Sequence, residues 1–226
     1  MISFDNVSKR YPGGHDGVSN ITLQINPGEM VFLTGHSGAG KSTMLRLIAL
    51  LERSTRGQLR VGGRNLTRLE RSQIPYHRRE VGMIFQDHRL LNDRTVFDNV
   101  ALPLIVAGLG HNEVGRRVRA ALDKVGLLKR EKAYPVTLSG GEQQRVGIAR
   151  AVVSKPPVVL ADEPTGNLDS ELSHEIMTLF ERFNQVGVTL LIATHDLELV
   201  RRLGKRTLVL HDGRLVQDRS SVYPNA

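Results

Sequence analysis

The 226-residue chain contains no cysteine and no tryptophan. Without cysteine, it cannot form disulfides, thiolate metal sites or cysteine nucleophiles, which is typical of a protein in a reducing compartment. The N-terminal residues lack the basic and then apolar pattern of a secretory signal. The longest apolar run, residues 100–109, contains Pro103 and Gly108 and is about half as long as a membrane span. We therefore expect a cytosolic protein that reaches a membrane only through a partner.

Acidic residues are the minority among the charged side chains. The 31 lysines and arginines outnumber 23 aspartates and glutamates and give a net charge of +8. Such a charge is typical of proteins that bind nucleic acid or lie beside an anionic membrane. However, the basic residues are scattered and aromatic residues form only 4% of the chain, so no basic and aromatic alternation for RNA stacking is present. We expect solvated helix faces to carry this charge, and no nucleic acid to bind.

One glycine-rich stretch organises the chain. The sequence GHSGAGKS at 35–42 follows an apolar run and precedes an amphipathic helical pattern. That context is typical of the G-x-x-x-x-G-K-[ST] loop, or Walker A motif, whose backbone N–H groups surround a phosphate beside a helix N-terminus. We expect Lys41 to reach the β- and γ-phosphates of a nucleoside triphosphate and Ser42 to bind Mg²⁺. The predicted nucleotide-binding residues of this stretch are Gly35, His36, Ser37, Gly38, Ala39, Gly40, Lys41, Ser42 and Thr43.

Three later apolar runs end on polar side chains: Gln86, the pair Asp162 and Glu163, and His195. Ligands of parallel sheets bind at the carboxyl ends of the strands, so these side chains are expected to face the nucleotide. Asp162 fits the acid that holds Mg²⁺, and Glu163 fits the general base that polarises water. Gln86 could contact Mg²⁺ or the attacking water, and His195 could bond the γ-phosphate or that water. Surface acids in a turn, a plain strand-end glutamine and an isolated histidine are the structural alternatives.

Two further positions allow both a functional and a structural interpretation. Tyr11 ends the first predicted strand, where its ring could stack on an adenine or simply cover the surface. Ser139 and Glu142 form a predicted capping box around Gly140 and Gly141. Glycines in a first turn leave N–H groups open at the positive end of the helix, as a second anion site requires. A helix cap without any ligand is the alternative.

Strand and helix patterns alternate along most of the chain, which predicts a single α/β domain over residues 1–226. A block of helical patterns interrupts the alternation, with Thr95 as a predicted N-cap and Asn112 and Glu113 at the start of a second helix. This block predicts an inserted helical subdomain at about 88–155. A final hairpin is expected around Asp212 and Gly213, followed by a loose tail at 220–226.

The motif LSGGEQQR at 138–145, beside Walker A, VVLADE at 158–163 and THD at 194–196, resembles the ATP-binding subunits of ABC transporters over essentially the whole chain. This resemblance implies a P-loop NTPase with a RecA-like core, an antiparallel β subdomain and a helical subdomain. It also implies an ATPase that uses ATP and Mg²⁺.

The same resemblance assigns roles to individual residues. It implies that Tyr11 stacks on adenine, that Gln86 is the Q-loop residue, that Asn167 to Asp169 form the D-loop, and that His195 is the switch histidine. Family subunits pair head to tail, which implies a homodimer whose lone subunit hydrolyses ATP poorly. The signature residues Ser139, Gly140, Gly141 and Glu142 would then serve the partner's nucleotide. Glu163, His195, Gln86 and Lys41 are the expected catalytic residues, and Ser42, Gln86 and Asp162 are the expected metal ligands.

Within the family, stretches such as 33–40, 82–88 and 90–100 resemble the members that act in bacterial cell division. Those members pair with FtsX, a four-helix integral membrane protein, at the cytoplasmic face of the inner membrane. They also associate with the FtsZ division ring and couple ATP-driven closure to cell-wall hydrolysis. The apolar segment 100–109, beside Gln86, is the expected docking surface, unless it forms the core of its own subdomain.

Three competing interpretations remain. The first is the ATPase of a lipoprotein-releasing or macrolide-export transporter, whose members usually carry Ser or Pro where His36 stands. The second is an ABC ATPase acting on DNA or ribosomes, but this chain is too short for the usual coiled-coil insertions or tandem cassettes. The third is a binding module with an idle ATPase, which intact Glu163 and His195 disfavour.

Overall fold

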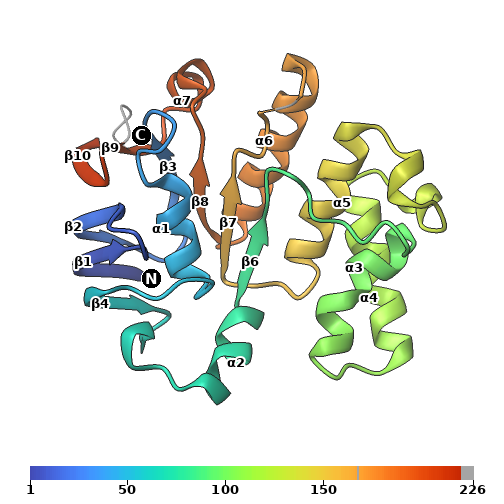
Figure 1. Cartoon of the computed structure of the whole chain (residues 1–226). Helices are drawn as coiled ribbons and strands as arrows, with labels where there is room; N and C mark the ends of the chain where they lie inside the picture. Colours follow the sequence, from blue (N-terminus) through green and yellow to red (C-terminus); the bar gives the residue numbers. More distant parts are fainter. Residues whose placement is uncertain (167, 220–226) are drawn as a thin grey trace.

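The computed structural model describes residues 1–166 and 168–219 (Figure 1). Asn167 of the expected D-loop and the tail 220–226 lie outside the described residues. The strands are β1 (Ile2–Arg10), β2 (Asp16–Ile25), β3 (Met30–Thr34), β4 (Arg56–Val61), β5 (Arg64–Asn65), β6 (Val81–Ile84), β7 (Val158–Asp162), β8 (Thr189–Ala193), β9 (Arg206–His211) and β10 (Arg214–Arg219). The α-helices are α1 (Lys41–Ile48), α2 (Ile74–Arg79), α3 (Val96–Val106), α4 (His111–Lys124), α5 (Gly140–Val152), α6 (Ser170–Gln185) and α7 (Leu197–Leu203).

The strands form two sheets. The larger has the order β10-β9-β3-β8-β7-β6, with β9, β3, β8, β7 and β6 parallel and β10 antiparallel to β9. The central strands β3 and β8 are buried along their whole length, which explains why they are continuous apolar runs in the sequence. The smaller sheet, β2-β1-β4-β5, is antiparallel. The predicted α/β fold with a separate antiparallel sheet is confirmed.

Alternate residues of the parallel strands point into two hydrophobic clusters on opposite faces of the large sheet. On β3, Phe32 joins the cluster shared with α3 to α7, whereas Val31 and Leu33 join the cluster shared with α1 and the antiparallel sheet. Figure 1 shows the same division, with α1 on one side of the sheet and α5 and α6 on the other. The first cluster runs from helices α3 to α5 into the sheet without interruption. An inserted subdomain at 88–155 stays a prediction.

Both N-caps predicted in the inserted block, Thr95 and Ser139, are confirmed. The Thr95 hydroxyl accepts a hydrogen bond from the Asp98 N–H (3.1 Å), and the Ser139 hydroxyl accepts one from the Glu142 N–H (3.2 Å). The second predicted helix is also present, but α4 begins at His111, one residue before Asn112, and is capped by Gly110. The Gly110 carbonyl already accepts the first helical hydrogen bond, from Val114, so Asn112 lies inside the first turn.

Helix α3 uses its two sides differently. Val100 and Leu104 are buried in the core, whereas Leu102, Ile105 and Val106 are 40%, 57% and 60% exposed. The apolar run therefore serves the core with one side and leaves an apolar surface on the other, which stays a candidate docking surface. In the part of the chain that the structure describes, no helix combines the length and the apolar character that a bilayer crossing requires.

Candidate functional site

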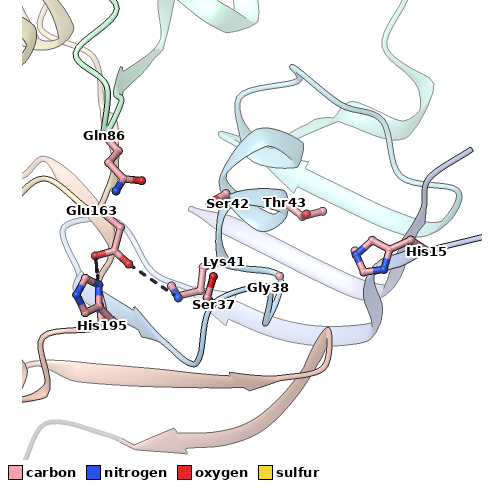
Figure 2. A pocket seen from close by; sticks show the side chains of 11 residues that line it. His15, Ser37, Gly38, Lys41, Ser42, Thr43, Gln86, Glu163 and His195 are labelled. Carbon is pink, nitrogen blue, oxygen red and sulfur yellow. Dashed lines mark hydrogen bonds and ion pairs between the residues drawn. The ribbon is translucent and has the colours of Figure 1, made fainter. Parts of the chain in front are cut away.

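A cavity of about 550 Å³ opens where β3, β6, β7 and β8 end (Figure 2). Its volume lies within the range of small-molecule binding sites. The lining residues are His15, Gly17, Ser37, Gly38, Gly40, Lys41, Ser42, Thr43, Gln86, Glu163 and His195. The structure thus brings the glycine loop together with Gln86, Glu163 and His195, which the sequence places far apart.

The loop from Gly35 to Gly40 curls tightly, and at two of its positions the surrounding backbone leaves room only for glycine. Gly40 has φ +104, and a Cβ there would overlap the Gly17 carbonyl oxygen. Gly35 has φ +148, and a Cβ there would overlap the Leu210 carbonyl oxygen. Helix α1 starts directly after the loop, and its N-cap Gly40 has no side chain to occupy the first N–H groups. These groups are therefore free to bind an anion such as a phosphate.

Lys41 lies over the loop with its ammonium group folded back. Its Nζ donates to the carbonyls of Gly35 (2.7 Å) and His36 (3.2 Å) and lies 3.9 Å from Oε1 of Glu163. The side chain is only 9% exposed. A buried ammonium held mainly by neutral carbonyls is well suited to bind a phosphate, because an anion strengthens its hydrogen bonds.

Glu163 connects this lysine with the histidine after β8. Its Oε2 accepts hydrogen bonds from His195 Nδ1 (2.9 Å) and from the His195 backbone N–H (3.3 Å). Because Nδ1 donates to Glu163, the other ring nitrogen of His195, Nε2, remains available for a hydrogen bond to a ligand. The Glu163 backbone has φ +49, a conformation that is uncommon for a residue with a side chain and that recurs at functional positions. The carboxylate is thus 11% exposed, oriented and at the cavity wall.

An oxygen-rich corner lies beside the loop. The Ser42 hydroxyl donates to Oδ1 of Asp162 (3.1 Å), and Gln86 lines the same cavity. Hydroxyl, carboxylate and amide oxygens are the ligand types that Mg²⁺ prefers. The three side chains predicted as metal ligands therefore fit a magnesium ion in their chemistry.

The signature residues Ser139, Gly140, Gly141 and Glu142 do not line this cavity. They start α5, which packs on the opposite face of the large sheet from α1 (Figure 1). The Ser139 backbone N–H donates to Glu142 (2.9 Å), and this bond, with help from Arg130, lowers the pKa of the Glu142 carboxyl. Within a single chain the signature and the glycine loop are therefore separate sites.

At the end of the cavity farthest from Glu163, the lining residues differ from those that the sequence predicted. Tyr11 does not line the cavity; its hydroxyl lies 3.3 Å from Oγ1 of Thr43, and Lys9 Nζ lies 4.9 Å from its ring centroid. His15 does line it, at the opposite end from Glu163 and His195 (Figure 2). Sequence reasoning missed His15 and Gly17. The available signal for His15 was an aromatic ring four residues after Tyr11 in the same turn.

Four other predicted residues also lie outside the lining of the cavity. Ala39 is buried beneath the loop, Gly35 packs against Leu210, and Asp162 reaches the site through Ser42. The His36 ring is exposed on the outside of the loop.

Comparisons with known proteins agree with this geometry. Residues 18–166 match the protein family described as ABC transporter. The chain is 60% identical over 215 residues to the cell division ATP-binding protein FtsE of Escherichia coli strain K12, covering 95% of this chain and 97% of that protein. It is 44% identical to FtsE of Bacillus subtilis strain 168, covering 97% and 96%. The solved dimeric ATP-binding cassette MJ0796, in a post-hydrolysis state bound to ADP and Pi, has a TM-score of 0.91 at 36% identity, covering 97% and 98%.

Proposed function

This chain belongs to the ABC transporter family, as an ATP-binding and ATP-hydrolysing cassette, and we propose that it is the ATPase subunit of a bacterial cell-division complex. In this proposal, closure of a homodimer around ATP acts on an FtsX-like integral membrane partner and regulates cell-wall hydrolysis during septation. The observation that carries this proposal is the 60% sequence identity, over nearly the whole length of both chains, to a relative named as a cell division ATP-binding protein.

The proposed mechanism assigns one task to each side chain of the cavity. Lys41 exchanges the carbonyls of Gly35 and His36 for the β- and γ-phosphates. Glu163, held by His195, polarises the water that attacks the γ-phosphate. His195 contributes a hydrogen bond to that phosphate.

Ser42, Asp162 and Gln86 would hold Mg²⁺, with Asp162 already hydrogen-bonded to Ser42. When bound, the ion neutralises charge that develops on the phosphate oxygens. His15 lies at the end of the cavity away from the reacting groups (Figure 2). Tyr11 does not line the cavity but contacts the lining residue Thr43, and His15 and Tyr11 are the proposed contacts of the adenine.

Dimerisation supplies the part of the site that a single chain lacks. Ser139, Gly140 and Gly141 start α5, which packs on the opposite face of the large sheet from α1, and they do not line the chain's own cavity. A second copy in head-to-tail orientation would bring this helix N-terminus to the γ-phosphate. The solved relative MJ0796 is itself dimeric and bound to ADP and Pi.

The membrane partner is proposed to dock on the exposed side of α3. Leu102, Ile105 and Val106 are at least 40% exposed there and offer an apolar surface. This contact would hold the protein at the cytoplasmic face of the inner membrane, at the division site, where association with the FtsZ ring is also proposed. Changing Ile105 to Glu should abolish recovery of the partner but not the ATPase of the isolated protein. Val186→Glu, at an even more exposed apolar residue at the C-cap of α6, should change neither.

Depletion of the protein in its native host tests the cellular part of the proposal. Depleted cells should form filaments with unfinished septa, and the wild type and Glu198→Gln should restore division. Glu163→Gln should not restore it, because it lacks the base that hydrolysis needs. Normal division after complete depletion would contradict the proposal.

Affinity capture of Glu163→Gln with ATP from the membrane fraction identifies the partner. Recovery of a four-helix membrane protein with division-ring components is expected. Recovery of a lipoprotein- or drug-export permease would instead assign the ATPase to transport.

A further inference from the structure

Three side chains on the outer side of the glycine loop form a cluster that the ATPase chemistry does not use. His36 belongs to the loop, and His211 and Asp212 lie at the tip of the β9–β10 hairpin. His36 Nε2 lies 3.3 Å from Oδ1 of Asp212, and His211 Nδ1 lies 3.3 Å from Oδ2. One ligand atom of each residue lies within 4.8 Å of the others. Over residues 1–166 and 168–219 no other histidine, cysteine and carboxylate group meets this criterion.

The ring of His36 is not engaged by the nucleotide cavity, because His36 does not line it. Its Nδ1 lies 2.7 Å from the Ser37 carbonyl oxygen, which can only accept, so Nδ1 carries the proton. In the neutral ring the remaining nitrogen, Nε2, offers a lone pair to a metal ion, and it is this atom that lies toward Asp212. A backbone carbonyl that binds one ring nitrogen in this way is the usual support of a metal-ligating histidine.

The three side chains lie close enough together to hold one metal ion. Nitrogen and oxygen ligands bind Zn²⁺ at about 2.0–2.1 Å, which places neighbouring ligands of a tetrahedron about 3.3–3.4 Å apart. The two nitrogens lie 3.3 Å from different oxygens of the Asp212 carboxylate, Oδ1 and Oδ2. One ligand atom of each residue lies within 4.8 Å of the others, so the exposed side chains need to close by at most about 1.5 Å around an ion. The two imidazole rings meet edge to face with centroids 5.0 Å apart.

Main-chain contacts hold the hairpin tip against the loop. The Gly213 N–H donates to the Ala39 carbonyl (3.0 Å), and the Gly213 carbonyl accepts from the Ser19 N–H (2.7 Å). Asp212 has φ +47 and Gly213 φ +75, as in the tight Asp-Gly turn of a two-residue hairpin. The backbones that carry the cluster are thus fixed independently of the exposed side chains.

We propose that His36, His211 and Asp212 bind one divalent transition-metal ion of the Zn²⁺ type. Two imidazoles and a carboxylate select such an ion over Mg²⁺, which prefers oxygen ligands. The side chains are 46%, 66% and 75% exposed, so water completes the coordination. The bound ion joins the glycine loop to the β9–β10 hairpin.

A protonated histidine paired with Asp212 would produce similar distances without any metal. Such pairs between exposed groups contribute little to stability and bind no ion. A direct titration with metal ions therefore distinguishes a metal site from an ion pair between histidine and Asp212.

The test uses full-length, nucleotide-free protein from which any polyhistidine tag has been removed, with excess Mg²⁺ present throughout. Isothermal titration with Zn²⁺ should show one tight site per chain, and Co²⁺ should develop the visible absorption of a tetrahedral complex. His211→Ala and Asp212→Asn should each weaken Zn²⁺ binding by at least about tenfold, since even the loss of a supporting residue costs that much. His174→Ala, at an exposed histidine on α6, should bind like the wild type.

Thermal unfolding provides a second readout. Zn²⁺ should raise the midpoint of the wild type and of His174→Ala but not of His211→Ala, since only a native-state ligand stabilises by mass action. Equal Zn²⁺ affinity in the wild type and His211→Ala, or no binding in either, would overturn the proposal. Both outcomes are independent of ATP hydrolysis and of cell division.

Discussion

The carboxylate of Glu163 accepts a hydrogen bond from His195, with 2.9 Å between Oε2 and Nδ1. Glu163 follows β7 and His195 follows the neighbouring strand β8, whose Ala193 pairs in register with Asp162. The Glu163 N–H also donates to the Ala193 carbonyl (2.9 Å). Adjacent parallel strands thus place a candidate base and the group that orients it side by side.

Glu163→Gln should abolish hydrolysis while nucleotide binding is retained. An amide cannot accept the proton of the attacking water, and loss of a general base typically costs between about a hundredfold and ten-thousandfold in rate. Binding is retained because Lys41 and the loop are unchanged, so ATP should accumulate the closed dimer. Steady-state hydrolysis, nucleotide titration and size-exclusion chromatography with ATP measure the three effects.

Glu198→Gln, at an acid of the first turn of α7, is the matched control for this variant and should hydrolyse ATP like the wild type. Wild-type turnover by Glu163→Gln would contradict the assignment of the base.

Lys41→Ala should weaken nucleotide binding itself. The buried ammonium is the cation of the loop, and hydrogen bonds to charged groups are worth about 1.5–3 kcal/mol, so affinity should fall about tenfold to a hundredfold. Fluorescence titration with a nucleotide analogue measures the loss. Lys124→Ala, at the last residue of α4, should leave the affinity unchanged. Unchanged affinity in Lys41→Ala would exclude the phosphate-binding role.

Ser139→Ala separates the helix cap from the signature role. Thr95→Ala removes an equivalent capping box from α3 and serves as its matched control. Each change should lower the free energy of unfolding by about 1 kcal/mol, because a side-chain acceptor is lost from the helix N-terminus. If Ser139 also serves a partner's nucleotide, only Ser139→Ala should lose ATPase activity.

Urea unfolding measures the stabilities in this pair, and hydrolysis at saturating ATP measures the activities. Equal activity in the two variants would leave Ser139 as a cap alone.

His77 should make the protein less stable below neutral pH. Burial lowers the pKa of His77 from its ordinary 6.5, and Arg64 and Arg78 act in the same direction, while the hydrogen bond to Ile48 and the charge of Glu80 oppose it. The ring is 1% exposed and donates from Nε2 to the Ile48 carbonyl (2.7 Å). As the pH falls through 6.5, His77 binds a proton in the unfolded chain but not yet in the folded chain.

The free energy of unfolding should therefore fall from pH 6.5 down to the lowered pKa, by at most about 1.4 kcal/mol per pH unit from this residue. Urea unfolding at about pH 7.5 and about pH 5.5 measures the change. His77→Gln should reduce the pH dependence, and His174→Gln, on the exposed side of α6, should preserve it. An identical pH dependence in His77→Gln would contradict the assignment.

Local features of this protein follow from the sequence alone. The glycine loop at 35–42, the caps Thr95 and Ser139, and the buried strands β3, β7 and β8 are each encoded within a few residues. Backbone conformation, hydrogen bonding and hydrophobic periodicity act over that range, so pattern and structure agree. The start of α4 shows the limit of such patterns, because the helix begins at His111 after Gly110, one residue before the predicted Asn112.

Tertiary structure alone decided which distant residues meet. The order β10-β9-β3-β8-β7-β6 brings Glu163 and His195 to Lys41, and it places the hairpin with His211 and Asp212 beside His36. It also made His15 rather than Tyr11 a lining residue. Strand order and packing determine which of these residues come into contact. The residues lie in segments far apart in the chain, so no local sequence pattern predicts that they meet.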